Sequence, residues 1–318
     1  MGLIMPMKHR LYTGLVGTAL LLVNANALAH SDTAHVESKQ CQLNILLTND
    51  DGWQAPGIQS LFKSLQHSPH KVTMVAPLTQ QSGRSSAINT AVGSSVSIKE
   101  QAPNVWSVDG TPADSVKAAL GIVLVDNAPD LLISGANFGP NVGQQTVLNS
   151  GTLGASLTAH HAGIPVIAMS VGMDVKERKT TPAYKSTIEG FETASLLVNR
   201  MISKLIAQNG CDTPLAGKHI LSINVPVPVG QIKGIKYAPL SPNELFHLTW
   251  HTDNNVNKIT YSQTDKSAAL NDDDVGYFLR KFITVTPISG DLTQGKADNA
   301  PTTEWQWLPD LSGVDLKQ

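Results

Sequence analysis

Short, continuously apolar runs alternate along the chain with stretches whose apolar residues recur at helical spacing. Runs without polar alternation are typical of strands covered on both faces, as in a parallel sheet. They occupy residues 44–48, 72–76, 130–134 and 165–170, and a further strand is expected over 219–225. Helices are predicted from residue 55 to 65 and over residues 112–123, 150–162 and 184–207. The alternation predicts an α/β fold with a mostly parallel sheet.

The pattern loosens after Pro226. The sequence becomes polar and rich in Asn and Asp, until residues 276–287 form another strand-like run. We therefore predict an α/β core over residues 30–232 and a C-terminal extension over 233–318, of which residues 276–293 return to the core.

The first residues have the three parts of an export signal. Lys8 and Arg10 precede an apolar run over residues 11–23, and Ala27-Leu28-Ala29 forms a small-x-small cleavage site. The run is too short for a membrane anchor, since roughly 20 apolar residues are needed to cross the hydrocarbon. We predict that residues 1–29 are a signal peptide, that the mature chain has no membrane segment, and that the protein is exported, to the periplasm.

Composition excludes several classes of protein. With 41% hydrophobic residues, the chain of 318 residues has enough apolar side chains for a large core, so disorder along its whole length is excluded. Its net charge of −2 argues against a broad basic face for a nucleic-acid duplex. The two cysteines, Cys41 and Cys211, each lie just upstream of a predicted strand. Export would allow a disulfide between them, and two free buried thiols are the alternative.

The strongest chemical signal is Asn49-Asp50-Asp51-Gly52, directly after the first strand. In open α/β sheets, ligands bind beyond the carboxyl ends of the strands. Two carboxylates held about 4 Å apart would repel each other by about 4 kcal/mol at an effective dielectric constant of 20. A divalent cation that prefers oxygen ligands, Mg²⁺ or Mn²⁺, would relieve this repulsion. The alternative is an ordinary Asx turn with both carboxylates in solvent.

Other predicted strand ends carry polar loops. Residues 77–86 include Ser82 and Arg84, and residues 135–143 are rich in Gly and Asn. The segment Ser150-Gly151-Thr152 opens a predicted helix, where free backbone N–H groups and two hydroxyls would suit a phosphate. A structural interpretation is also open, with Ser150 as a helix N-cap and the glycines serving tight turns.

Several long motifs lie in register along the chain: NDDGWQAPGI (residues 49–58), MVAP (74–77) with Ser82-Gly83, GTPADSV (110–116), PDLLISGANFGPNVG (129–143) and SGTLGAS (150–156). Together they resemble the SurE family of metal-dependent nucleotidases, and the resemblance covers most of residues 42–293. This family implies a Rossmann-like three-layer α/β/α fold with a C-terminal extension. It also implies a homodimer or homotetramer with exchanged C-terminal elements. The sequence departs from the family pattern at Ala136 and Asn149, where Ile and Tyr are usual.

The resemblance also implies the chemistry. One divalent metal per subunit, Mg²⁺ or Mn²⁺, would be held by Asp50, Asp51, Ser82 and Asn137, and the substrates would be 5'- or 3'-nucleoside monophosphates, with polyphosphate as a side substrate. The predicted substrate-binding residues are Ser150, Gly151, Thr152, Asn141 and Arg84, and the predicted catalytic residues are Asp50, Asp51 and Asn137.

We predict in-line attack by metal-activated water, with a phosphoaspartate on Asp50 as the alternative mechanism. Two other functions remain open at this point. One is a broad acid phosphatase or exopolyphosphatase, and the other is a non-catalytic nucleotide- or metal-binding protein of the same fold.

Overall fold

The computed structural model describes residues 41–210, 220–253, 255–264, 267 and 270–291. The predicted signal peptide, residues 1–29, lies outside this range. Within it, no helix is both long enough and apolar enough to cross a membrane. Cys41 is disulfide-bonded, and Cys211, the only other cysteine of the chain, lies outside the described residues.

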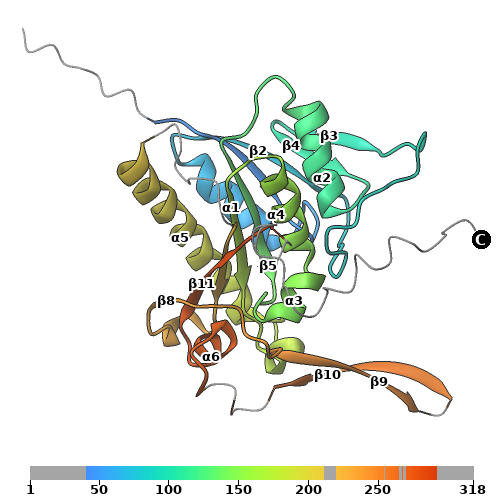
Figure 1. Cartoon of the computed structure of the whole chain (residues 1–318), viewed down its shortest axis with the longest axis vertical. Coiled ribbons are helices and arrows are strands. Elements are labelled where there is room, and N and C mark those ends of the chain that lie inside the picture. Colours follow the sequence, from blue (N-terminus) through green and yellow to red (C-terminus); the bar gives the residue numbers. More distant parts are fainter. Residues whose placement is uncertain (1–40, 211–219, 254, 265–266, 268–269, 292–318) are drawn as a thin grey trace, which may run out of the picture. The chain divides into compact units, whose positions relative to one another are not determined.

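A nine-stranded sheet forms the centre of the described structure, with strand order β3-β4-β2-β1-β5-β6-β7-β11-β8 (Figure 1). The six strands from β4 to β7 in that order run parallel to their neighbours. The edge strand β3 is antiparallel to β4, and β11 is antiparallel to β7. The strands span Asn44–Thr48 (β1), Lys71–Pro77 (β2), Ile98–Ala102 (β3), Val105–Val108 (β4), Leu131–Phe138 (β5), Val166–Val171 (β6), Ile220–Val225 (β7), Ile235–Tyr237 (β8) and Ile283–Ile288 (β11).

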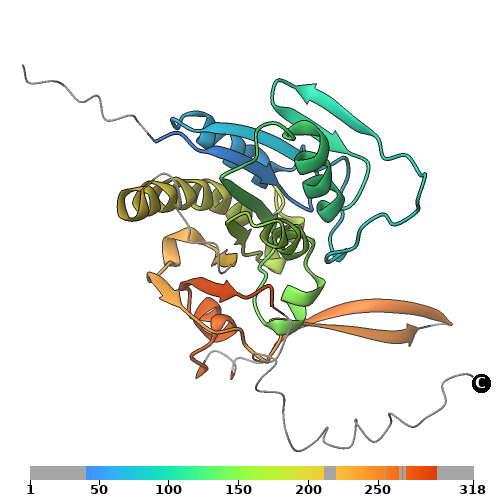
Figure 2. The same cartoon turned by 45° about the horizontal axis from the view of Figure 1, so that its top comes forward.

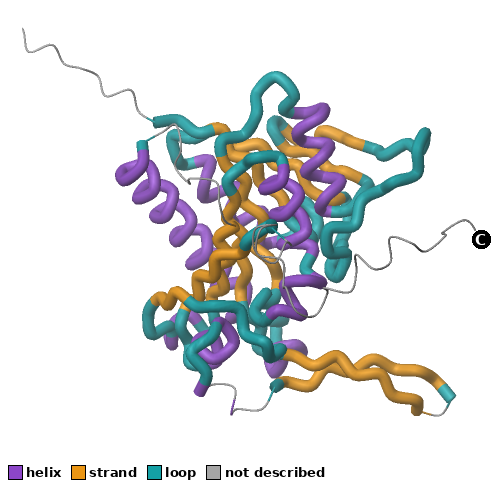
Figure 3. Tube along the Cα trace, in the orientation of Figure 1, coloured by secondary structure: helices purple, strands orange, loops and turns teal. Residues whose placement is uncertain are grey.

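Helices cover both faces of the sheet (Figure 3). On one face α1 packs against α5, and on the other α2 packs against α4. Shorter helical segments lie in the connections. The helices are Pro56–Gln66 (α1), Pro112–Ala118 (α2), Gln144–Asn149 (α3), Gly151–His161 (α4), Lys185–Asn209 (α5) and Asp274–Leu279 (α6), with a π-helical turn at Ala119–Val123 and 3-10 turns at Val175–Lys179 and Val229–Gln231.

Strand β1 shows why its sequence is continuously apolar. Ile45 and Leu47 face the core layer that contains the buried side of α1 and α5, whereas Leu46 faces the layer that contains α2 and α4. All three side chains are at most 1% exposed. A strand covered on both faces needs an apolar residue at every position, which confirms the predicted α/β fold with a mostly parallel sheet.

The C-terminal part of the chain contributes to the main sheet. β11 lies between β7 and β8, so two strands from the predicted extension complete the sheet that begins with β1. The prediction of one strand-like run over residues 276–287 is wrong in its first part, where α6 forms. Asp273 is the N-cap of this helix, and its Oδ1 accepts a hydrogen bond from the Gly276 N–H at 2.8 Å.

A separate two-stranded hairpin, β9 (Phe246–Asp253) and β10 (Val256–Gln263), extends away from the main sheet (Figure 2). The sequence pattern did not predict it. Trp250 pairs with Ile259 across the hairpin, and both side chains are exposed, as is Leu248. An isolated two-stranded hairpin is marginally stable by itself.

Candidate functional site

The carboxyl end of β1 carries the two adjacent aspartates in a tight turn. The side-chain amide of Asn49 donates to the Gly52 carbonyl at 2.9 Å, and Gly52 has a φ of 98° that favours glycine. Asp50 is only 3% exposed, and Asp51 is partly buried. The turn therefore holds both carboxyl groups inside the protein, and the interpretation of two solvated acids in an Asx turn is wrong.

Asp50 lies against the first turn of α4. The Thr152 hydroxyl donates to Asp50 Oδ1 at 2.7 Å. A Cβ atom on Gly151 would stand 2.7 Å from the Asp50 Cβ and 2.9 Å from its Oδ2, so only glycine permits this approach. Ser150 is the N-cap of α4, because its side chain accepts from the Leu153 N–H at 3.2 Å. The structure thus brings Asp50 against Gly151 and Thr152 of the predicted phosphate-binding segment, while Ser150 caps the same helix.

Asp51 is fixed by the end of β5. Its Oδ2 accepts a hydrogen bond from the Phe138 N–H at 2.8 Å. The neighbouring Asn137 is 7% exposed, and its side-chain nitrogen donates to the Gly139 carbonyl at 2.7 Å. This bond orients the amide so that Asn137 Oδ1 is the atom left to act as a metal ligand.

Burial raises the pKa of both carboxyl groups. For Asp51 the loss of solvent is the largest cause and the charge of Asp50 is the next, and together they raise its pKa to about 7 against the Phe138 hydrogen bond. Burial also raises the pKa of Asp50, against hydrogen bonds from Thr152 and Gly151 that lower it. Among the residues that the structure describes, neither carboxylate forms an ion pair with Lys, Arg or His.

A divalent cation suits this pair, because it would supply the positive charge that the described structure does not provide. The described residues contain no group of three or more His, Cys, Asp and Glu side chains placed to hold a metal. A cation at Asp50 and Asp51 would therefore take its remaining protein ligands from neutral oxygens, and Asn137 Oδ1 is one such atom. Hard cations such as Mg²⁺ accept few carboxylates together with neutral oxygens and water.

The loop after β2 also reaches the turn, although its predicted site residues stay exposed. The Gln81 N–H donates to the Asp50 carbonyl, which places the loop beside β1. Ser82 and Arg84 are exposed, and the Ser82 hydroxyl accepts a hydrogen bond from the Gln80 side chain at 2.8 Å. In the described structure neither residue has a hydrogen bond to the two aspartates, so their roles stay predictions.

Asn141 is buried in a polar network rather than exposed at the surface. Its side-chain nitrogen donates to Thr152 Oγ1 at 3.3 Å and to Ser170 Oγ at 3.0 Å. Its backbone N–H and C=O are both bound by the side chain of Asn224, at 2.7 and 3.2 Å. Asn141 therefore contacts Asp50 through Thr152. Our sequence analysis assigned no role to Asn224 or Ser170, although both are polar residues near the carboxyl ends of predicted strands.

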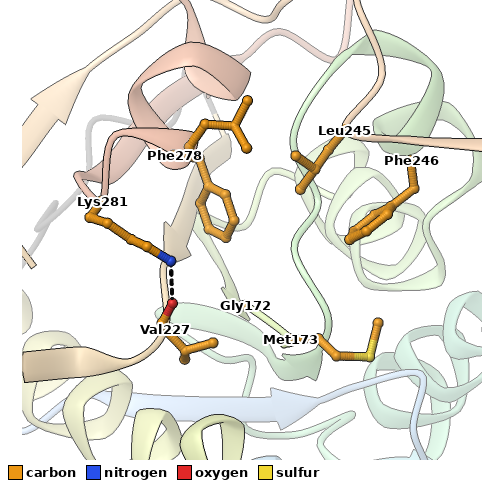
Figure 4. A pocket seen from close by; sticks show the side chains of 8 residues that line it. Gly172, Met173, Val227, Leu245, Phe246, Phe278 and Lys281 are labelled. Atoms are coloured by element: carbon orange, nitrogen blue, oxygen red, sulfur yellow. Dashed lines mark hydrogen bonds between the residues drawn. The ribbon is translucent and has the colours of Figure 1, made fainter. Parts of the chain in front are cut away.

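A small pocket of about 70 Å³ lies beyond the ends of β6 and β7 (Figure 4). Inside it the Lys281 ammonium donates to the Val227 carbonyl at 2.5 Å. None of the predicted site residues lines this pocket. Its walls are Gly172, Met173, Val227, Leu245, Phe246, Phe278, Leu279 and Lys281.

Comparisons with known proteins point to one family. A family model described as "Survival protein SurE" matches residues 45–246. The chain is 32% identical to the 5'-nucleotidase SurE of Carboxydothermus hydrogenoformans, over 86% of this chain and 98% of that protein. It is 30% identical to the 5'/3'-nucleotidase SurE of Photorhabdus laumondii, over 85% and 99% of the two chains. The crystal structure of the SurE protein from Aquifex aeolicus superposes with a TM-score of 0.66 at 26% identity, covering 84% of this chain and 99% of that one.

Proposed function

The chain belongs to the SurE family, and on this basis we propose that it is a nucleotidase that releases phosphate from 5'- or 3'-nucleoside monophosphates. The observation that carries the proposal is the pair formed by the buried Asp50 and the partly buried Asp51, with Asp50 bonded to the first turn of α4. Carboxylates that could hold a cation therefore lie beside the start of a helix, which attracts a phosphate. A cation and such a helix start both stabilise the charge of a phosphoryl group during its transfer.

We propose Asp50, Asp51, Ser82 and Asn137 as ligands of one divalent cation, Mg²⁺ or Mn²⁺. When bound, it would neutralise phosphoryl oxygens and increase the acidity of a bound water. The chain's own groups have separate tasks. Thr152 and Phe138 hold the two carboxylates in place, and the positive end of the α4 dipole would favour a phosphate bound nearby.

Water is the nucleophile in this proposal. In the alternative mechanism the Asp50 carboxylate would itself attack the phosphorus atom and form a phosphoaspartate. Incubation with labelled substrate followed by rapid denaturation would test the proposal of water as the nucleophile, and label retained on the chain would overturn it.

The decisive experiment measures phosphate release from 5'-AMP, 3'-AMP and polyphosphate with Mg²⁺ or Mn²⁺ and then with a chelator. We expect hydrolysis of the monophosphates that the chelator abolishes. Asp50→Asn and Asp51→Asn should both remove activity, whereas the control Asp126→Asn, at an exposed position before β5, should not. Full activity in either site variant would refute the assignment. Faster turnover of polyphosphate or of unrelated monoesters would favour the exopolyphosphatase or broad phosphatase.

We propose export to the periplasm because residues 1–29 carry the pattern of a cleaved signal. Expression of the full-length chain, cell fractionation and N-terminal sequencing would test this. The mature protein should begin at His30, and recovery of the intact N-terminus in the cytoplasm would contradict the proposal.

We further propose that the protein is a homodimer or homotetramer. The hairpin β9–β10 supports this, since Leu248, Trp250 and Ile259 are exposed on two strands that pair with no further strand in the described part of the chain. Light scattering after size exclusion should give a multiple of the chain mass, and Trp250→Glu should lower it. A monomer in the unmodified protein would refute the proposal.

A further inference from the structure

The C-terminal part of the chain is bonded to the loop that carries Asn141. Asp274, at the start of α6, is completely buried. Its Oδ2 accepts from the Gly143 N–H at 2.9 Å, and its Oδ1 accepts from the N–H groups of Ser241 and Val275 at 2.8 and 2.9 Å. One carboxylate therefore joins three backbone segments, one of which is 131 residues away in sequence.

Apolar packing holds the same loop. Val142 is fully buried in a small cluster with Leu245, Val275 and Phe278, all from the C-terminal part of the chain. Gly143, with a φ of 81°, has no room for a Cβ, which would meet the Asn243 carbonyl at 2.4 Å. Residues 241–245 and α6 thus hold the loop over residues 139–143 in its observed conformation.

A continuous set of hydrogen bonds leads from this loop to the candidate site. Two residues before Gly143, the side chain of Asn141 donates to Thr152, whose hydroxyl donates to Asp50. The Asn141 backbone is held from the other side by Asn224. A shift of the loop would move the group that fixes the Asp50 carboxylate.

We propose that Asp274 is a positioning residue for the Asp50–Asp51 site, holding the loop over residues 139–143 so that Asn141 orients Thr152 against Asp50. The inference rests on the proposed function. It assigns the C-terminal segment a part in forming the site, although the segment supplies none of the predicted metal ligands.

The test compares Asp274→Asn with Asp273→Asn in the full-length mature protein. An asparagine at 274 can present its oxygen to the N–H groups of Ser241 and Val275. Its NH₂ group would then face the Gly143 N–H, and two donors cannot form a hydrogen bond with each other. The control position lies next to it and contacts Ser241 and Gly276 but not the loop. Both variants therefore change the start of α6, but only Asp274→Asn removes the hydrogen bond to the Gly143 N–H.

We expect Asp274→Asn to weaken Mn²⁺ binding, measured by calorimetry, by about 10- to 100-fold, as for residues that orient metal ligands. The kcat for AMP should fall by a similar factor with a smaller change in KM, whereas Asp273→Asn should change each value less than about twofold. Unchanged Mn²⁺ affinity and kcat in Asp274→Asn would overturn the inference, and so would equal losses in both variants.

The calorimetry separates this inference from the proposed function. Weakened Mn²⁺ binding in Asp274→Asn alone would support the positioning role even if the unmodified chain did not hydrolyse AMP. Amide exchange in the unmodified chain needs no variant at all. The N–H groups of Asn141 and Gly143 should exchange as slowly as those inside β5, and rapid exchange at either would overturn the inference.

Discussion

The charge of Asp51 should lower the stability of the metal-free protein, although the same charge is proposed to bind the metal. Its carboxyl group accepts one hydrogen bond from Phe138, lies next to the buried Asp50, and has no cationic partner among the described residues. Replacing it by Asn keeps the size of the side chain and an oxygen for the Phe138 N–H, but removes the charge. In metal-free protein, we expect Asp51→Asn to be more stable than the unmodified chain.

The magnitude follows from the pKa. Burial and the Asp50 charge raise the pKa of Asp51 from 3.8 to about 7. The folded chain therefore binds more protons than the unfolded chain between about pH 4 and pH 7, and its stability falls as the pH rises through this window. At 1.36 kcal/mol per pKa unit, the ionised group costs about 4 kcal/mol at pH 8. The asparagine variant avoids this loss.

The assay is urea unfolding in the presence of a chelator, for both proteins at pH 4 and pH 8. The difference in free energy of unfolding between variant and unmodified chain should grow by about 4 kcal/mol from the lower to the higher pH. A dication at well above about 1,000 times its dissociation constant should then reverse the order at pH 8, because it would stabilise only the chain that binds it, by more than about 4 kcal/mol. If the difference were the same at both pH values, the electrostatic argument would be refuted.

Three further changes test the surroundings of Asp50. Gly151→Ala should destabilise the protein by about 1 to 3 kcal/mol in urea unfolding and should lower kcat/KM, because the new methyl group overlaps the Asp50 side chain; unchanged kinetics would contradict the close approach. Thr152→Val should lower kcat/KM by about 10- to 100-fold, corresponding to a hydrogen bond to a charged group, whereas Thr152→Ser should stay near the unmodified value. At pH 8, Mn²⁺ at 100 times its dissociation constant should stabilise the unmodified chain by about 2.7 kcal/mol, and no effect of the ion would exclude binding to the folded state.

The central strands were predictable because each has to be apolar on both faces. The run over residues 165–170 corresponds closely to β6, whose residues are all buried. The same logic failed for β9 and β10, since a hairpin outside the core carries exposed polar residues such as His247 and Thr249 and has no buried face to mark it. The spacing of apolar residues reveals a helix or strand only where one of its faces is buried, and β9 is almost entirely exposed.

The candidate site was predictable only in part, for a related reason. Residues at the carboxyl ends of parallel strands lie along one edge of the sheet, so the turn with Asp51 and the loop with Asn137 could be placed on the same edge, and the family resemblance singled out Asn137 within its loop. No such rule places Asp274 beside Gly143, because α6 reaches the loop through tertiary packing alone. Patterns over a few neighbouring residues cannot predict a contact between residues 131 positions apart.

The place of β11 in the sheet has a consequence for how the chain is made. Strand β7 acquires its second neighbour only when residues 283–288, which come after every predicted metal ligand in the sequence, have been added. Until then one edge of β7 has unpaired backbone N–H and C=O groups. These groups can pair with a strand of another nascent chain. A product truncated before residue 283 should therefore be prone to aggregate, even though it already contains every residue predicted to bind the metal.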